Sequence, residues 1–397
     1  MLKAGVGSSV GVDAYREGGN AAMQAMTQMG DTTADVAIVF ASVFYDQQKV
    51  LEGVRSIVQD AIIVGCSTAG EITTQGPSNK SSIAVMTLKS DKIKFYADVG
   101  EQIHYSPRGA GKSVAEKINQ KAGGSLNMFM MFPDVLVGNG ADIVRGVTDV
   151  LGENFPVVGG AAGDDFKFEK TFQYLNETVH TGCVVALGMK GPLTVGIGVK
   201  HGWIPIGIPR KVTKSQGSIL YELDSKPAIG IYEEYFGQMA DELRKEKLAK
   251  LAITYPLGMK VEGHDEMLLR DPIQVDVDGS ITCAAEIPEG SEIQLMIGSY
   301  EEAVRVAEEA ARNTMSQIGI ATPKAIVIFN CIARHKLFGD RAGEEIKVIQ
   351  SVIGKEIPLI GFYTYGEQAP LGGEVKNMKT CPPAFHNETV VICVLAE

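Results

Sequence analysis

Three Gly-rich loops carry most of the side chains that could take part in chemistry. Each follows an apolar run and ends in an acid, in the segments IIVGCSTAGEI (62–72), PVVGGAAGDD (156–165) and PLIGFYTYGEQ (358–368). Glycine lets the backbone approach a ligand closely, and a carboxylate beside that backbone can bind an ammonium group. The candidate ligand-binding acids are therefore Glu71, Asp164, Asp165 and Glu367. The alternative is that these acids cap the turns or helices that follow them.

Two of the loops add small polar or aromatic side chains. Cys66, Ser67 and Thr68 precede Gly70 in the first loop, and the third loop contains Tyr363, Thr364 and Tyr365. These groups suit hydrogen bonding to a ligand. Cys66 or Ser67 could instead be the nucleophile of a hydrolase or transferase. Because no G-x-S-x-G elbow is present and no base is assigned, ligand binding is the favoured interpretation.

Further polar residues follow the apolar run AIVIFNC (325–331) and precede the last apolar run. They are Asn330, Cys331, Arg334, His386 and Asn387. An arginine after a buried strand can clamp a carboxylate, or it can form a structural ion pair, here with Glu345. We expect the loops 67–71 and 363–367 to share one cleft with Arg334 and His386 on its rim, a set that suits a zwitterion.

Metal and cofactor sites are not predicted. Cys331, His335 and His386 lack the second clustered pair of a structural zinc site. The opening GVGSSVG (5–11) does not have the G-x-G-x-x-G spacing of a dinucleotide site.

The Gly-rich loops belong to a larger repeat. Before each loop stands another apolar run ending in Phe, and a helical pattern lies between the two runs. The segments 36–72, 128–165 and 325–368 are therefore predicted to be βαβ units with their Gly-acid loops at equivalent strand ends. An Asn-x-Ser/Thr sequence follows each copy, at Asn79, Asn176 and Asn387, and the tetrapeptide Asn-Glu-Thr-Val is identical in the last two. The predicted fold class is α/β, with two domains of repeated βαβ-type units, mixed sheets and Gly-rich loops at strand ends.

The rest of the chain is assigned around these units. We expect a strand at 2–9, a helix from Asp13, a linker at 204–209 and a domain boundary near residue 210, giving domains 1–210 and 211–397. A helical stretch is predicted from Pro227 to about Leu251, and a hairpin with its turn at Asp278-Gly279. A helix is also predicted from Tyr300 to about Ile318, opened by a capping box at Ser299.

Composition narrows the class of protein. The chain of 397 residues is 45% hydrophobic and 21% charged, with a net charge of -11, which is typical of a folded protein that does not bind nucleic acid. No apolar run approaches the roughly 20 residues of a membrane span, so no membrane insertion is expected. The six cysteines form no C-x-x-C pair. We expect reduced, mostly buried thiols and a cytoplasmic location.

Taken together, these motifs resemble the FIST family of F-box and intracellular signal transduction proteins. GCSTAGEI (65–72) carries the likeness of a FIST N-type domain over 1–210. Phe329 to Arg334, Gly361 to Glu367 and His386 to Thr389 carry that of a FIST C-type domain over 211–397. The resemblance implies no reaction and no catalytic residues.

What the resemblance does imply is a sensor module. Such a module would bind an amino acid or a similar small polar metabolite and signal through a separate protein such as a histidine kinase or chemoreceptor. It is compatible with a homo-oligomer. The competing interpretations are the Cys66 or Ser67 enzyme and a purely structural or interaction protein.

Overall fold

The computed structural model describes residues 1–78, 80–245, 250–261, 263–264, 266–371 and 382–397. Asn79 and Cys381 lie outside these ranges. The five described cysteines are free and buried, as predicted. Within the described ranges, no helix has the length and apolar character needed to cross a membrane.

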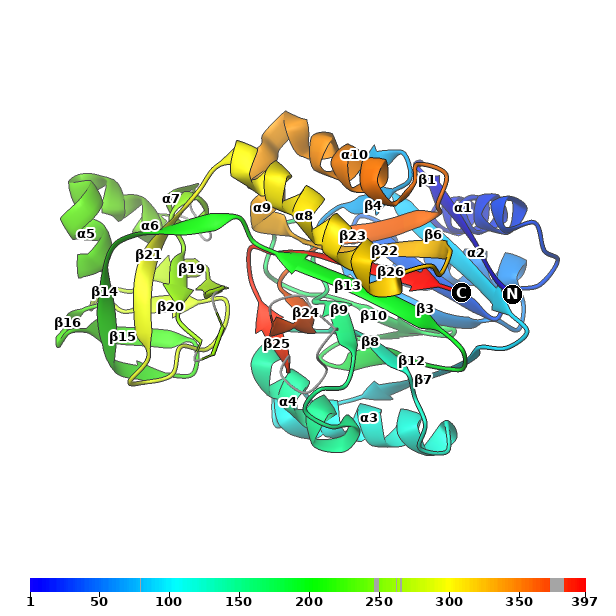
Figure 1. The fold of residues 1–397 in the computed structure, drawn as a ribbon, viewed down its shortest axis with the longest axis horizontal. Coiled ribbons are helices and arrows are strands. Elements are labelled where there is room, and N and C mark those ends of the chain that lie inside the picture. Colours follow the sequence, from blue (N-terminus) through cyan, green and yellow to red (C-terminus); the bar gives the residue numbers. More distant parts are fainter. Residues whose placement is uncertain (79, 246–249, 262, 265, 372–381) are drawn as a thin grey trace.

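Three repeats of the same element order build the main body (Figure 1). The first contains β1 (Leu2–Ser9), α1 (Ala14–Met29), β2 (Val36–Ser42), α2 (Gln47–Val58), β3 (Ile62–Thr68), β4 (Glu71–Thr73), β5 (Gly76–Pro77) and β6 (Ile83–Ser90). The second contains β7 (Lys94–Gly100), α3 (Pro107–Lys121), β8 (Met128–Pro133), α4 (Gly140–Leu151), β9 (Val157–Gly160), β10 (Gln173–Leu175), β11 (Thr178–His180) and β12 (Val184–Lys190). The third contains β13 (Thr194–Lys200), α8 (Tyr300–Ile318), β22 (Pro323–Cys331), α9 (Ile332–Phe338), η2 (Gly339–Arg341), α10 (Ala342–Ile353), β23 (Leu359–Thr364), β24 (Glu367–Pro370), β25 (Pro383–His386) and β26 (Val390–Ala396).

The predicted βαβ units are confirmed. β2 pairs with β3, β8 with β9 and β22 with β23, each in parallel. Each sheet takes its other strands from two repeats, in the orders β1-β6-β2-β3-β10-β11, β7-β12-β8-β9-β24-β25 and β13-β26-β22-β23-β4-β5. Every repeat therefore contributes one hairpin, β4–β5, β10–β11 or β24–β25, to the sheet of another repeat. The three sheets are interlocked by this exchange.

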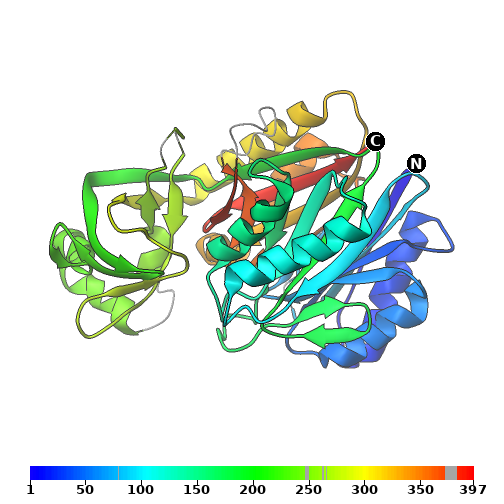
Figure 2. The same ribbon diagram turned by 90° about the horizontal axis from the view of Figure 1, so that it is seen from below.

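One apolar core lies between the three sheets, and the helices cover their outer faces (Figures 1 and 2). A Phe lies near the end of the first strand of each βαβ unit, and it is buried in this shared core with no exposed surface. These residues are Phe40, Phe132 and Phe329. The ring centroids of Phe40 and Phe132 are 5.7 Å apart, and those of Phe132 and Phe329 are 6.3 Å apart. The repeated Phe is thus a packing residue at the point where the three sheets meet.

The identical Asn-Glu-Thr-Val sequences do not occupy equivalent positions, contrary to the prediction. Asn176 lies in the turn between β10 and β11, whereas Asn387 lies between β25 and β26. Glu177 is solvent-exposed and pairs with Arg55, but Glu388 is completely buried. Strand pairing, and not this tetrapeptide, establishes the repeat.

A separate sheet is inserted into the third repeat between β13 and α8. This insert (residues 203–298) contains β14 (Trp203–Gln216), β15 (Ile219–Leu223), β16 (Lys226–Pro227), α5 (Gly230–Phe236), η1 (Gly237–Asp241), α6 (Glu242–Lys245), α7 (Lys250–Thr254), β17 (Leu257–Met259), β18 (Leu268–Arg270), β19 (Pro272–Val275), β20 (Ile281–Cys283) and β21 (Glu292–Gly298). It has its own apolar core and projects from one end of the body, opposite the end that holds both termini (Figures 1 and 2).

Predictions for this region have mixed outcomes. The hairpin with Asp278-Gly279 at its turn and the capped helix at 300–318 are confirmed. The linker at 204–209 is wrong, because these residues belong to the long strand β14. The helical stretch predicted from Pro227 to about Leu251 is confirmed in part, because helical segments occupy 230–245 and 250–254, whereas Pro227 itself pairs in β16. The boundary expected at residue 210 stays a prediction and falls within β14.

Replacing Phe329 tests the shared core. We expect Phe329→Ala to lower the free energy of unfolding by about 3–5 kcal/mol, because the cavity would open where all three sheets converge. Phe44→Ala is the matched control, since that ring is 62% exposed, and it should cost less than about 1 kcal/mol. Chemical denaturation followed by circular dichroism measures both. Equal effects of the two changes would contradict the proposed role of Phe329.

Candidate functional site

The strand register identifies which side chains are equivalent in the three repeats. Glu71 in β4 lies opposite Phe362, Glu367 in β24 lies opposite Gly160, and Gln173 in β10 lies opposite Cys66. The three opposing residues each directly follow the motif glycine of their repeat. Gln173 is therefore the counterpart of the two glutamates. The predicted equivalence of the acid in GDD (163–165) is wrong, because the second repeat inserts a loop before β10.

Each of these three side chains is buried and held by hydrogen bonds. Thr68 and Ser82 donate to Glu71, and Thr364 and Thr389 donate to Glu367. Burial raises the pKa of Glu71 to about 7 and that of Glu367 to about 8. These hydrogen bonds therefore link the start of each exchanged strand to the repeat that the strand leaves.

The first and third loops lie together, as expected. The backbone N–H of Ala69 donates to the Tyr363 carbonyl at 3.1 Å, and the Tyr363 N–H donates to the Gly70 carbonyl at 2.8 Å. The two loops thus contact each other directly. They form an internal contact between sheets where the sequence predicted a shared cleft.

The expected rim position of Arg334 and His386 is wrong. Arg334 is completely buried and forms an ion pair with Glu345, which is also buried. Its guanidinium also donates to the backbone carbonyls of His201 and Ala303. His386 is 5% exposed, and burial lowers its pKa to about 4. The structural ion pair, one of the two interpretations of Arg334, is the one that the geometry shows.

The remaining predicted residues of this group are also internal. The side-chain amide of Asn330 donates to Glu345 at 2.7 Å, and Asn387 is 1% exposed. Burial raises the pKa of the Cys66 and Cys331 thiols well above the ordinary value. Ser67 donates to the Gly163 carbonyl at 2.7 Å and accepts from the Phe172 N–H. Neither Cys66 nor Ser67 is placed to attack a substrate from solvent.

A cleft of about 780 Å³ lies where the second and third repeats meet the insert. The body side is formed by the loops after β8, β9 and β23, and the insert side by the β14–β15 turn, β19 and β20. The described lining residues are Val135, Leu136, Val137, Gly138, Asn139, Phe168, Glu169, Gln216, Gly217, Ser218, Ile219, Ile273, Thr282, Cys283, Ala284, Ala285 and Tyr365. Among these, Tyr365 is the one residue that the sequence analysis predicted for the site.

The loop between β9 and β10 presents Phe168 and Glu169 to this cleft, and Asp164 holds the backbone of the loop in place. The Asp164 carboxylate accepts from the backbone N–H groups of Phe168, Glu169 and Lys170 at 2.8, 2.7 and 2.9 Å. The Tyr365 hydroxyl donates to the same carboxylate at 2.5 Å. Asp164 is thus an organising residue behind the cleft.

This loop also contains an unusual run of strained backbone. Asp165, Phe166 and Phe168 have φ values of 54°, 65° and 52°, in the left-handed region that costs a non-glycine residue about 1–3 kcal/mol. The strain places the Phe168 ring against Tyr365, with centroids 4.6 Å apart and planes 15° from parallel. We call this stacked pair the aromatic platform. Strain of this kind is typical of functional loops.

Sequence reasoning missed Phe168, Glu169 and Asn139. An Asp pair followed by Phe-x-Phe gave no recognisable signal, because the left-handed turns depend on hydrogen bonds to Asp164. Asn139 was also missed, although an Asn directly before a helical pattern indicates an N-cap, and its side chain does accept from the Ala141 N–H.

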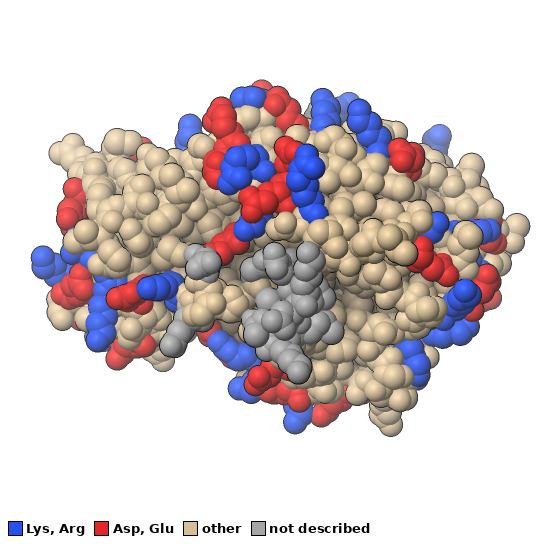
Figure 3. Space-filling view, in the orientation of Figure 1, with Lys and Arg blue, Asp and Glu red and all other residues tan. Residues whose placement is uncertain are grey.

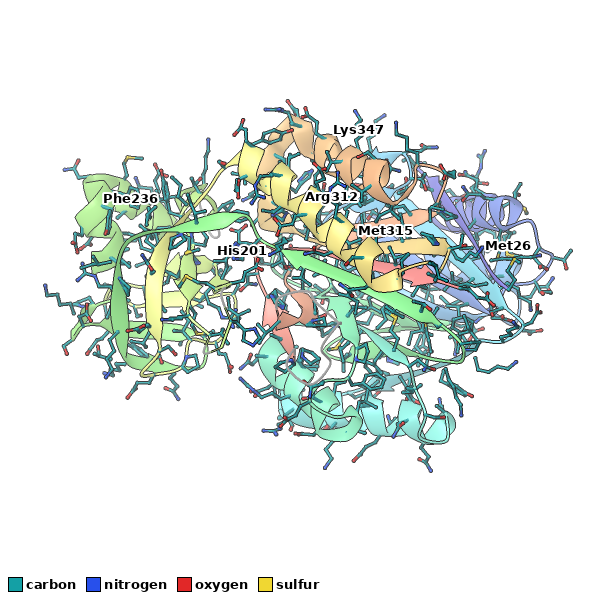
Figure 4. The ribbon with its side chains drawn as sticks, in the orientation of Figure 1. Met26, His201, Phe236, Arg312, Met315 and Lys347 are labelled. Atoms are coloured by element: carbon teal, nitrogen blue, oxygen red, sulfur yellow. The ribbon has the colours of Figure 1, made fainter. Side chains whose placement is uncertain are left out.

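Contacts beside the cleft hold the insert to the body. Arg145 of α4 forms an ion pair with Glu286 of the insert, and the Asn139 amide donates to Glu286 at 2.8 Å. Figure 4 shows His201 at the junction of the two parts and Phe236 among the helices of the insert. Elsewhere, acidic and basic side chains are intermixed over α8, where Arg305 and Arg312 pair with neighbouring glutamates (Figure 3).

The fold first defines a class: α/β proteins with three interlocked βαβ repeats and a β-rich insert in the third. The FIST N domain model matches residues 35–226, and the FIST C domain model matches residues 228–370. The chain therefore belongs to the FIST family.

Relatives of the chain include proteins without an assigned role. An uncharacterized protein from Methanocaldococcus jannaschii is 28% identical over 290 residues, which cover 68% of this chain and 55% of that protein. The chain thus spans about half the length of this relative. An uncharacterized protein from Mycobacterium tuberculosis is 23% identical over 381 residues, covering 94% of this chain and 96% of that protein.

Solved structures show only distant similarity. A cyanuric acid hydrolase from A. caulinodans aligns with a TM-score of 0.38 and 9% identity over 99% of each chain. A chorismatase aligns with a TM-score of 0.40 and 10% identity over 100% of this chain and 98% of that chain. Neither likeness assigns a site or an activity.

Asp164→Asn tests the loop that carries the aromatic platform. Because a carboxylate bonded to N–H groups contributes about 1–3 kcal/mol, its neutralisation should release the loop and speed amide exchange at 168–170. Hydrogen exchange with mass spectrometry measures this. Asp165→Asn is the control, since that carboxylate accepts from Ser42 instead. Unchanged protection at 168–170 in Asp164→Asn would show that the loop is held by other contacts.

Glu367→Gln tests the buried carboxyl. Its folded pKa, about 8, lies above the ordinary 4.5, so the folded state binds the extra proton between these values and stability falls as pH rises. This loss is at most about 1.4 kcal/mol per pH unit for one group. Gln173 occupies the equivalent place, so glutamine should be accepted there.

Relative to wild type, Glu367→Gln should therefore become more stable on going from about pH 5 to about pH 8. Denaturation curves at both pH values measure the difference. The exposed Glu289 provides a control, and Glu289→Gln should run parallel to wild type. A constant difference between Glu367→Gln and wild type would mean that Glu367 does not titrate in this range.

Proposed function

We propose that this chain is a small-ligand sensor module of signal transduction, and that it binds an amino acid or a similar small polar metabolite in the cleft between body and insert. The observation that carries the proposal is the cleft itself. Its volume of about 780 Å³ lies within the range of small-molecule sites, about 300–1,000 Å³. Its position beyond the carboxyl ends of parallel strands is where α/β proteins bind ligands.

The lining has the composition of a binding site. Apolar and aromatic side chains surround a few polar groups, namely Asn139, Glu169, Gln216, Ser218 and Thr282. The stacked ring of Phe168 is fixed in place by the Asp164 network. Preorganised walls of this type lower the entropic cost of binding.

A ligand in this cleft would contact both the body and the insert. The two parts are joined by the chain at β14 and β21 and by contacts such as Arg145 with Glu286. A ligand that binds one relative orientation better shifts the population toward it. We propose that a separate signalling protein, such as a histidine kinase or chemoreceptor, responds to this shift.

The alternative of a Cys66 or Ser67 enzyme has less support. Both side chains are fully buried, and the Cys66 thiol has a raised pKa because burial disfavours the thiolate. The cleft thiol, Cys283, also has its pKa raised by burial, to about 12. These thiols are unsuited to nucleophilic attack near neutral pH.

A thermal-shift screen with amino acids, nucleotides and organic acids tests the binding proposal. A ligand at about 100 times its Kd should stabilise the folded chain by about 2.7 kcal/mol. Ser218→Trp fills the cleft and should abolish the shift, whereas Ser125→Trp, in an exposed turn, should preserve it. A shift that survives in Ser218→Trp would place the ligand elsewhere, and no shift with any compound would favour an interaction protein.

A further inference from the structure

The described residues that line the cleft include one acidic residue and no basic residue. Glu169 is the one charged side chain among the described residues that line it, and it forms no ion pair within the described part of the chain. Asp142 and Glu286 lie behind the rim, where both bond to Asn139. The cation at this place, Arg145, is already paired with the same two carboxylates.

The start of α4 does not offset this charge. A helix N-terminus attracts anions, and Gly138 and Asn139 bring that of α4 to the rim. However, Asp142 lies in the first turn, and the Asn139 side chain occupies the Ala141 N–H at 3.0 Å. The Asp142 carboxylate and the Asn139 amide oxygen thus already occupy the place that an anionic ligand would take at this helix end.

The apolar walls favour a flat ligand. Phe168 packs one face on Tyr365 and remains partly exposed toward the cleft. Ile219, Ile273 and Ala284 form the wall that the insert contributes. A planar group that enters between these surfaces stacks on a fixed ring, and a positive charge near the ring is further stabilised by its π-electrons.

We propose that the cleft selects planar aromatic ligands that carry an ammonium group, with Phe168 as the stacking surface and Glu169 as the counter-ion. This proposal rests on the proposed binding function and names its ligand class. A carboxylate on the ligand finds no cation among the described lining residues. Such a carboxylate must stay in contact with solvent, because burying it in the cleft would weaken the binding of the ligand.

Four probes with one phenol ring test the selection: tyramine, tyrosine, 4-ethylphenol and 3-(4-hydroxyphenyl)propionate. Calorimetry on the full chain should show tyramine binding at least about tenfold more tightly than the propionate, with tyrosine and 4-ethylphenol between them. Glu169→Gln should remove the advantage of tyramine over 4-ethylphenol. Phe168→Leu should weaken all four, and the exposed control Glu153→Gln should change none.

The outcomes separate this inference from the binding function. Propionate binding as tight as that of tyramine, or an unchanged preference in Glu169→Gln, would overturn the ligand class. The ligand class would also be overturned if none of the four probes binds but another compound binds to the wild type and not to Ser218→Trp. In that case the cleft would still be a binding site. If no compound of any class binds, both proposals fail.

Discussion

The exchange of hairpins among the three repeats is the constraint on which the rest of the structure depends. β4–β5 completes the sheet of the third repeat, β10–β11 that of the first and β24–β25 that of the second. No repeat has a complete sheet by itself, and all three sheets share one apolar core. The first residue of each exchanged strand, Glu71, Gln173 or Glu367, is buried where two repeats join. Polar groups are retained there because each finds partners in the adjoining strands and loops.

Two departures from this symmetric plan produce the cleft. The second repeat has a long loop before β10, and the Asp164 carboxylate folds it so that Phe168 stacks on Tyr365. The third repeat receives the insert, whose β14–β15 turn and β20 face that loop. The cleft therefore lies where the threefold plan is broken, whereas the equivalent loops of the first and third repeats bond to each other between sheets.

The location of the cleft is the basis of the proposed link between binding and signalling. Body and insert have separate cores, so a ligand that binds between them as we propose would shift the balance between their relative positions. The FIST relatives compared with this chain have no assigned role, and the aromatic platform supplies a defined place at which to test one.

The sequence by itself determined the α/β class, the three βαβ units and their cores, because apolar periodicity and turn residues are local signals. It also identified Glu71 and Glu367 as a matched pair, since their loops share one pattern. Only the tertiary structure decided what these residues do, because burial and hydrogen-bond partners come from strands distant in sequence. The strand register identifies Gln173 as their counterpart, and the buried ion pair with Glu345 identifies Arg334 as an internal residue. Apart from Tyr365, the cleft could not be predicted, because it depends on left-handed turns around Asp164 and on the packing of the insert against loops of the second and third repeats.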